Sequence, residues 1–136
     1  MKVFIDTNVM IDVIGSREPF YADAAKLFAL AEHGVIQIAA SSISYVNTFY
    51  VLRKYHSAKQ LKSVLQKMRT ICAIAAVSEM DIDKALLSDF DDFEDAVQYY
   101  AAIHDRSDVF VTRNKKDFKN ATLPVMTPSE FIASIR

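Results

Sequence analysis

Five short apolar segments recur along this chain, and their continuity constrains the fold more than any other feature. They cover residues 3–5, 36–40, 72–77, 109–112 and 124–127. Hydrophobic residues in these segments do not alternate with polar ones, which is typical of strands covered on both faces. Segments with helical features separate them, so that strands and helices alternate. This order predicts an α/β fold with a mostly parallel five-stranded sheet flanked by helices.

Helix signals occupy the intervening segments. Apolar spacing predicts a helix over residues 19–33 that ends at Gly34, and two more over residues 42–55 and 57–70. Ser78 and Thr127 each precede an acid by three residues, which is typical of a helix start. With 136 residues, 51% of them hydrophobic, the chain is expected to form one domain over residues 1–136.

Several function classes are excluded by the composition. Gly15 and Gly34 are the only glycines, which rules out the Gly-rich phosphate loops of the common nucleotide-binding families. The apolar stretches are far shorter than the ~20 residues needed to cross a bilayer, so no membrane partner is expected. Asp6 interrupts the N-terminus before the apolar region of a signal peptide could form, and a cytoplasmic location is therefore expected. Cys72 is the single cysteine and cannot form an internal disulfide.

The charges are unevenly distributed, although the net charge is only −1. Residues 33–78 contain no acid and six basic residues, whereas residues 79–95 contain eight acids and one lysine. A second basic cluster covers residues 113–119. Such runs indicate either solvated helix faces or basic surfaces beside an acidic pocket, where a polyanion would be held near metal-binding carboxylates.

Polar residues follow two of the predicted strands directly. Asp6, Thr7 and Asn8 come after the first strand, and Thr112 begins a second polar group after the fourth. Asp92 and Asp95 open a predicted helix between them, where helix capping is the competing explanation for Asp92. Because carboxyl ends of parallel strands meet at one edge, these acids are expected to converge. Converging carboxylates favour a hard cation, Mg²⁺ or Mn²⁺.

The order of these motifs resembles that of PIN domains over essentially the whole chain. The matching segments begin at Asp6-Thr7-Asn8-Val9, Ser42, Asp92-Phe93-Glu94-Asp95-Ala96, Val111-Thr112-Arg113-Asn114, Asp117-Phe118 and Pro124. PIN domains are metal-dependent nucleases, and many are the ribonuclease toxins of bacterial VapBC-type toxin–antitoxin pairs. The resemblance implies that Asp6, Asp95 and Asp117 bind metal. It makes Asp92 an accessory catalytic acid, with Asn8, Thr112 and Asn114 in support.

One position departs from the family pattern. Asn47 stands where the helix after the second strand usually supplies a Glu, and its side chain is expected to point toward Asp6. An amide can ligate a hard cation but contributes no charge, so Glu94 or Asp92 would have to replace it. The alternative is a catalytically degenerate PIN-like module that only binds RNA or a protein. Phosphatases of the haloacid dehalogenase type are excluded because Asn8 replaces their second Asp, and receiver domains because residues 75–78 hold no acceptor Asp.

The expected activity is therefore Mg²⁺- or Mn²⁺-dependent hydrolysis of RNA by a single PIN-like α/β domain. Basic residues are expected to neutralise the phosphate backbone without reading the base sequence. The candidates are Arg53, Lys59, Lys62, Arg113 and Lys116. The resemblance further implies an antitoxin protein as partner, and a homodimer.

Overall fold

A five-stranded parallel sheet forms the centre of the molecule in the computed structural model, which describes residues 1–119 and 121–135. Its strand order is β3-β2-β1-β4-β5, and all four pairings are parallel. The strands are β1 (Lys2–Ile5), β2 (Gln37–Ser41), β3 (Cys72–Ala75), β4 (Val109–Val111) and β5 (Val125–Met126). The predicted fold class is confirmed, with the predicted third and fifth strands shorter than expected.

Seven α-helices and one 3₁₀ helix connect the strands within the described residues. They are α1 (Thr7–Ile14), α2 (Tyr21–Glu32), α3 (Ser42–Leu52), α4 (Ala58–Arg69), α5 (Glu79–Leu86), α6 (Phe93–His104), η1 (Lys115–Phe118) and α7 (Pro128–Ser134). The predicted helix starts at Ser78 and Thr127 are capping boxes in the structure. Helix α1 lies outside the helices that the sequence patterns predict.

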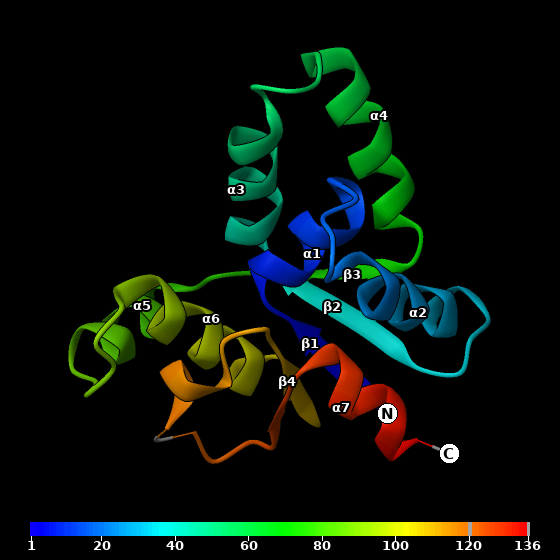
Figure 1. The fold of residues 1–136 in the computed structure, drawn as a ribbon. Helices are drawn as coiled ribbons and strands as arrows, with labels where there is room; N and C mark the ends of the chain where they lie inside the picture. Colours follow the sequence, from blue (N-terminus) through cyan, green and yellow to red (C-terminus); the bar gives the residue numbers. More distant parts are fainter. Residues whose placement is uncertain (120, 136) are drawn as a thin grey trace.

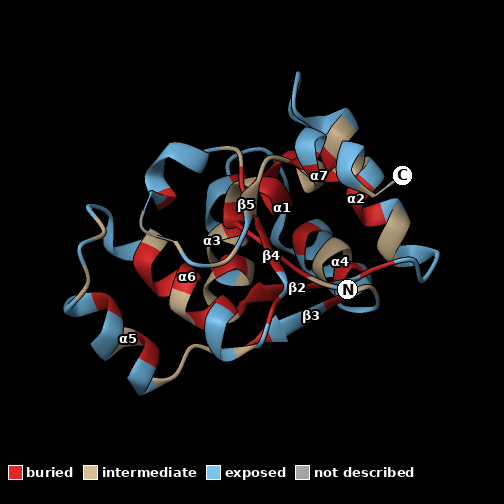
Figure 2. Ribbon diagram, turned by 90° about the horizontal axis from the view of Figure 1, so that it is seen from below, coloured by how far each residue is buried: buried red, intermediate tan, exposed pale blue. Residues whose placement is uncertain are grey.

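Two helical layers cover the strands β1, β2 and β4, which explains their continuous apolar runs, whereas Ala73 and Ile74 of the edge strand β3 are exposed. Val3 and Ile5 face the core shared with α1, α2 and α7, whereas Phe4 faces the core shared with α6 and η1. All three side chains are fully buried. Figure 1 shows α2 and α7 on one side of the sheet and α5 and α6 on the other, and Figure 2 shows the buried strands between them.

The path of the chain through the sheet determines where a ligand can bind. From β1 the chain runs outward through β2 to β3, and it then crosses to β4 and β5 on the other side of β1. The switch point therefore lies between the carboxyl ends of β1 and β4, where open α/β sheets bind ligands. Asp6 and Thr112 are the first residues after these two strands. No helix in the described part of the chain is long and apolar enough to cross a membrane.

Candidate active site

Asp6 lies at the switch point and is almost completely buried, with 6% of its surface exposed. It is the N-cap of α1, and its Oδ1 accepts a hydrogen bond of 2.8 Å from the backbone N–H of Thr7. The Thr112 hydroxyl donates to the second oxygen, Oδ2, at 2.8 Å. Both carboxylate oxygens are therefore held in place, one by the first residue of α1 and the other by the residue after β4.

Asn8 and Thr112 form the support around this carboxylate. The Asn8 amide nitrogen donates to Asp6 Oδ2 at 3.3 Å and to Thr112 Oγ1 at 3.2 Å. The backbone N–H of Asn114 donates to Thr112 Oγ1 at 3.1 Å, and that of Arg113 donates to Asn8 Oδ1 at 3.3 Å. Asn8 and Thr112 thus support Asp6 with their side chains, whereas Asn114 reaches this network through its backbone.

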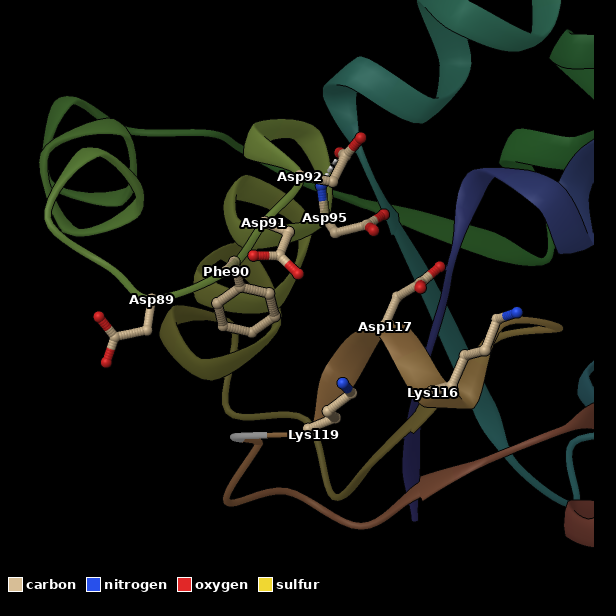
Figure 3. A pocket seen from close by; sticks show the side chains of 8 residues that line it. All are labelled: Asp89, Phe90, Asp91, Asp92, Asp95, Lys116, Asp117 and Lys119. Atoms are coloured by element: carbon tan, nitrogen blue, oxygen red, sulfur yellow. Dashed lines mark hydrogen bonds between the residues drawn. The ribbon is translucent and has the colours of Figure 1, made fainter.

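The remaining candidate acids come from α6 and η1. Asp92 caps α6, and its Oδ1 accepts the N–H of Asp95 at 2.9 Å, as the spacing predicted. Asp92 and Asp117 are exposed and Asp95 is half-buried. In Figure 3 the carboxylates of Asp95 and Asp117 point toward the same space. The three acids line one cleft of about 330 Å³, together with Asp89, Phe90, Asp91, Lys116 and Lys119.

The acids of the site repel one another. Burial and the charges of Glu94 and Asp117 together raise the pKa of Asp6 to about 6, against the effect of the hydrogen bonds from Thr112 and Thr7. Burial, which is the largest cause, and the charges of four other acids together raise the pKa of Asp95 to about 7. Those acids are Asp6, Asp92, Asp117 and Glu94. The acid that follows β1 and the acids of α6 and η1 therefore share one electrostatic environment.

This donor set fits a hard divalent cation. All of its ligand atoms are carboxylate, amide or hydroxyl oxygens, which Mg²⁺ and Mn²⁺ prefer. Burial and neighbouring acids raise the pKa values of Asp6 and Asp95, and a bound cation would oppose both effects. As the side chains stand, no three acids among residues 1–119 and 121–135 are spaced to hold one ion. The exposed side chains of the set would have to turn toward Asp6 when a cation binds.

Asn47 has a different neighbour from the one expected. Its side chain was predicted to point toward Asp6, but its amide nitrogen donates to Glu94 Oε1 on α6 at 3.1 Å. Asn47 belongs to α3, so the contact joins two helices that are far apart in the sequence. Among the described residues Asn47 makes no hydrogen bond to Asp6, and its side chain contacts the first turn of α6 instead.

The sequence patterns do not predict a buried cluster of polar side chains that lies next to the site. The Gln98 amide nitrogen donates to Thr7 Oγ1 at 2.7 Å and to Ser44 Oγ at 2.8 Å. Gln98 and Ser44 are fully buried and Thr7 nearly so. The cluster joins three helices of the site. Helix α1 follows Asp6 directly, α3 carries Asn47 and α6 carries Asp95. A Gln within the apolar face of α6 was the available signal.

The predicted phosphate-binding residues lie in different surroundings. Arg113 Nε donates to buried Asp12 at 2.6 Å, and its guanidinium lies 4.2 Å from the centre of the Phe20 ring. Arg113 is thus engaged inside the protein, whereas Lys116 lines the acidic cleft. Arg53 lies over the Tyr50 ring, and Lys59 and Lys62 are exposed on α4. Figure 1 shows α3 and α4 extending away from the sheet as a pair.

The fold and the site define an α/β protein with an acidic cleft at the switch point of a parallel sheet. The chain belongs to the PIN domain family, because a PIN domain model matches residues 2–116. This match confirms that the sequence motifs resemble those of PIN domains, and it supports a hydrolytic nuclease as the class of this protein. No curated protein matches the chain.

Solved structures of toxin–antitoxin proteins are similar to this chain. A toxin–antitoxin complex from Klebsiella pneumoniae is 27% identical with a TM-score of 0.68, over 93% of this chain and 97% of that one. VapBC2 from Rickettsia felis, bound to a promoter DNA fragment, is 21% identical with a TM-score of 0.65 over the same shares. VapC20 from Mycobacterium tuberculosis, a sarcin-ricin loop cleaving toxin, is 14% identical with a TM-score of 0.63, over 79% of this chain and 86% of that one. At these identities the last two show the fold alone.

Proposed function

We propose that this chain is a Mg²⁺- or Mn²⁺-dependent ribonuclease and the toxin of a toxin–antitoxin pair. The observation that carries the proposal is the buried Asp6 carboxylate at the switch point, in one electrostatic environment with Asp95 and Asp117. The similarity to a toxin–antitoxin complex from Klebsiella pneumoniae supports the biological role. That similarity also favours an antitoxin protein as partner, and a homodimer stays a prediction of the family resemblance.

The acids would have different roles, which follow from their positions. Asp6 would hold the cation in fixed geometry, because Thr7, Asn8 and Thr112 already orient its carboxylate. Asp95 and Asp117 would complete the binding set from α6 and η1, and Asp92 would orient the first turn of α6 through its cap. When bound, a divalent cation activates a water molecule and stabilises the leaving oxygen of the phosphodiester.

Basic residues would bind the RNA backbone on either side of the cleft. Lys116 and Lys119 line the cleft next to the acids and would contact phosphates flanking the scissile one. Arg53, Lys59 and Lys62 would extend this contact along α3 and α4. Arg113 would act indirectly, because its ion pair with Asp12 holds the segment after β4 in place.

Cleavage of RNA by the purified chain tests the proposal. Activity is expected with Mn²⁺, none in EDTA, and a large loss in Asp6→Asn and Asp95→Asn. Asp83→Asn is the matched control, because Asp83 is an exposed acid on α5 outside the cleft. A chain that binds RNA but leaves it intact with either metal would instead be a degenerate PIN-like binding module.

A further inference from the structure

Glu94 on α6 is held by a hydrogen bond from another helix, α3. It lies in the first turn of α6, directly before Asp95, and its side chain is exposed. The Asn47 amide nitrogen of α3 donates to its Oε1 at 3.1 Å. The contact spans 47 residues of sequence, so the tertiary fold creates it.

Glu94 also interacts electrostatically with two other acids of the site. Its charge contributes to the raised pKa of Asp6 at the end of β1 and to that of Asp95, the next residue on α6. Asp6 and Asp95 lie on different elements. Glu94, like Asp117, therefore belongs to the electrostatic environment that these two acids share.

A structural role at the helix terminus does not explain this arrangement. Acids in a first turn are stabilised by the helix dipole without any partner on another helix. Asp92 already caps the N–H of Asp95, so Glu94 is not needed as the cap. The partner on α3 is a neutral amide, which orients a carboxylate without neutralising it. A Lys or Arg at position 47 would instead compete with a bound cation.

We propose that Glu94 is a further metal-binding carboxylate of this site and that Asn47 is the residue that positions it. The inference rests on the proposed function, since it concerns the same cation. The family pattern places an acid on α3, at the position of Asn47. In this chain Glu94 on α6 would supply that acid, and the amide of Asn47 would hold it in position. The binding set then consists of Asp6, Asp95, Asp117 and Glu94.

Calorimetric titration of the full chain with MnCl₂ tests this assignment without relying on cleavage. Glu94→Gln keeps the size of the side chain and an oxygen for Asn47. It should weaken Mn²⁺ binding about 100-fold, because a unit charge beside a divalent ion is lost. Asn47→Ala removes only the orienting contact and should weaken binding about tenfold, as for other residues that orient a metal ligand. Glu79→Gln is the control, an exposed acid in the first turn of α5, and should bind Mn²⁺ like the wild type.

Exchange of the two residues distinguishes a ligand from a general effect of charge. The double variant Asn47→Glu/Glu94→Gln moves the acid from α6 to α3 and should recover Mn²⁺ affinity to within about fivefold of the wild type. Wild-type affinity in Glu94→Gln, with affinity lost in Asp6→Asn, would overturn this inference and leave the proposed function intact. Wild-type affinity in Asp6→Asn as well would overturn the proposed function itself. Wild-type affinity in Asn47→Ala would remove the positioning role of Asn47.

Discussion

Replacement of Asp6 by Asn should make the metal-free protein more stable at neutral pH and less stable in acid. The substitution preserves the size of the side chain and an oxygen for the N–H of Thr7. It removes the charge, and it places an NH₂ group where the other oxygen accepts the Thr112 hydroxyl. The two consequences have opposite signs and different pH dependence.

The charge dominates at neutral pH. Below the ordinary pKa of 3.8 the carboxyl is protonated in both the folded and the unfolded chain and does not affect stability. Between 3.8 and the folded pKa of about 6, only the folded chain keeps the proton, so the free energy of unfolding falls as pH rises. At 1.36 kcal/mol per pKa unit, ionised Asp6 costs about 3 kcal/mol at pH 7. The mismatched hydrogen bond in Asp6→Asn costs about 1 kcal/mol at every pH.

Urea denaturation in EDTA between pH 4 and 8 measures the difference. We expect Asp6→Asn to be about 2 kcal/mol more stable than the wild type at pH 7, and about 1 kcal/mol less stable at pH 4. Saturation with Mn²⁺ at about 100 times its Kd should then stabilise the wild type by about 2.7 kcal/mol and the variant hardly at all. Asp83→Asn should follow the wild type throughout.

A variant that is equally destabilised at pH 4 and pH 7 would refute this reasoning. It would mean that the Asp6 carboxylate is satisfied by Thr7, Asn8 and Thr112, and that its charge is not a cost to the fold. The same curves test the electrostatic coupling, because loss of the Asp6 charge should also lower the pKa of Asp95.

Three further predictions concern residues around the site. Arg113→Met should destabilise the protein by about 3 kcal/mol in urea denaturation, because it leaves buried Asp12 without its partner. Lys115→Met, which breaks the exposed pair with Glu130, should have no measurable effect on stability. Gln98→Leu should destabilise by about 1–2 kcal/mol, and its effect should not add to that of Thr7→Val, since the two side chains share one hydrogen bond. Lys59→Glu/Lys62→Glu should weaken RNA binding and flatten its log–log salt dependence by about 0.7 per lost phosphate contact, whereas an unchanged slope would assign these lysines to solvation of α4.

The sequence could predict those parts of the site that follow from strand direction and local spacing. Asp6 and Thr112 each end an apolar run, and in a parallel sheet such positions share one edge. Asp92 precedes Asp95 by three residues, which is the spacing of a helix cap, and the structure shows that hydrogen bond. Both inferences use periodicities that do not depend on how the helices pack.

The contacts between helices could not be predicted in the same way. The partner of Asn47 depends on the rotation of α3 about its axis and on its distance from α6, which are set by side-chain packing over the whole core. The hydrogen bond of Arg113 to Asp12 depends on the position of α1, a helix that the sequence patterns do not predict. Gln98 stands out within the apolar face of α6, but its partners on α1 and α3 depend on how the helices pack.

The charge of Asp6 is the feature that the fold itself does not explain. An N-cap residue needs one side-chain oxygen, and Asn caps a helix as well as Asp does. The second oxygen of Asp6 accepts hydrogen bonds from Thr112 and Asn8, and an Asn would lose these bonds at a cost of about 1 kcal/mol. That cost is smaller than the cost of about 3 kcal/mol of the charge, because burial and neighbouring acids together raise the pKa of Asp6 to about 6. A divalent cation turns that repulsion into attraction, and on this ground the arrangement favours a metal-binding site over a structural cap.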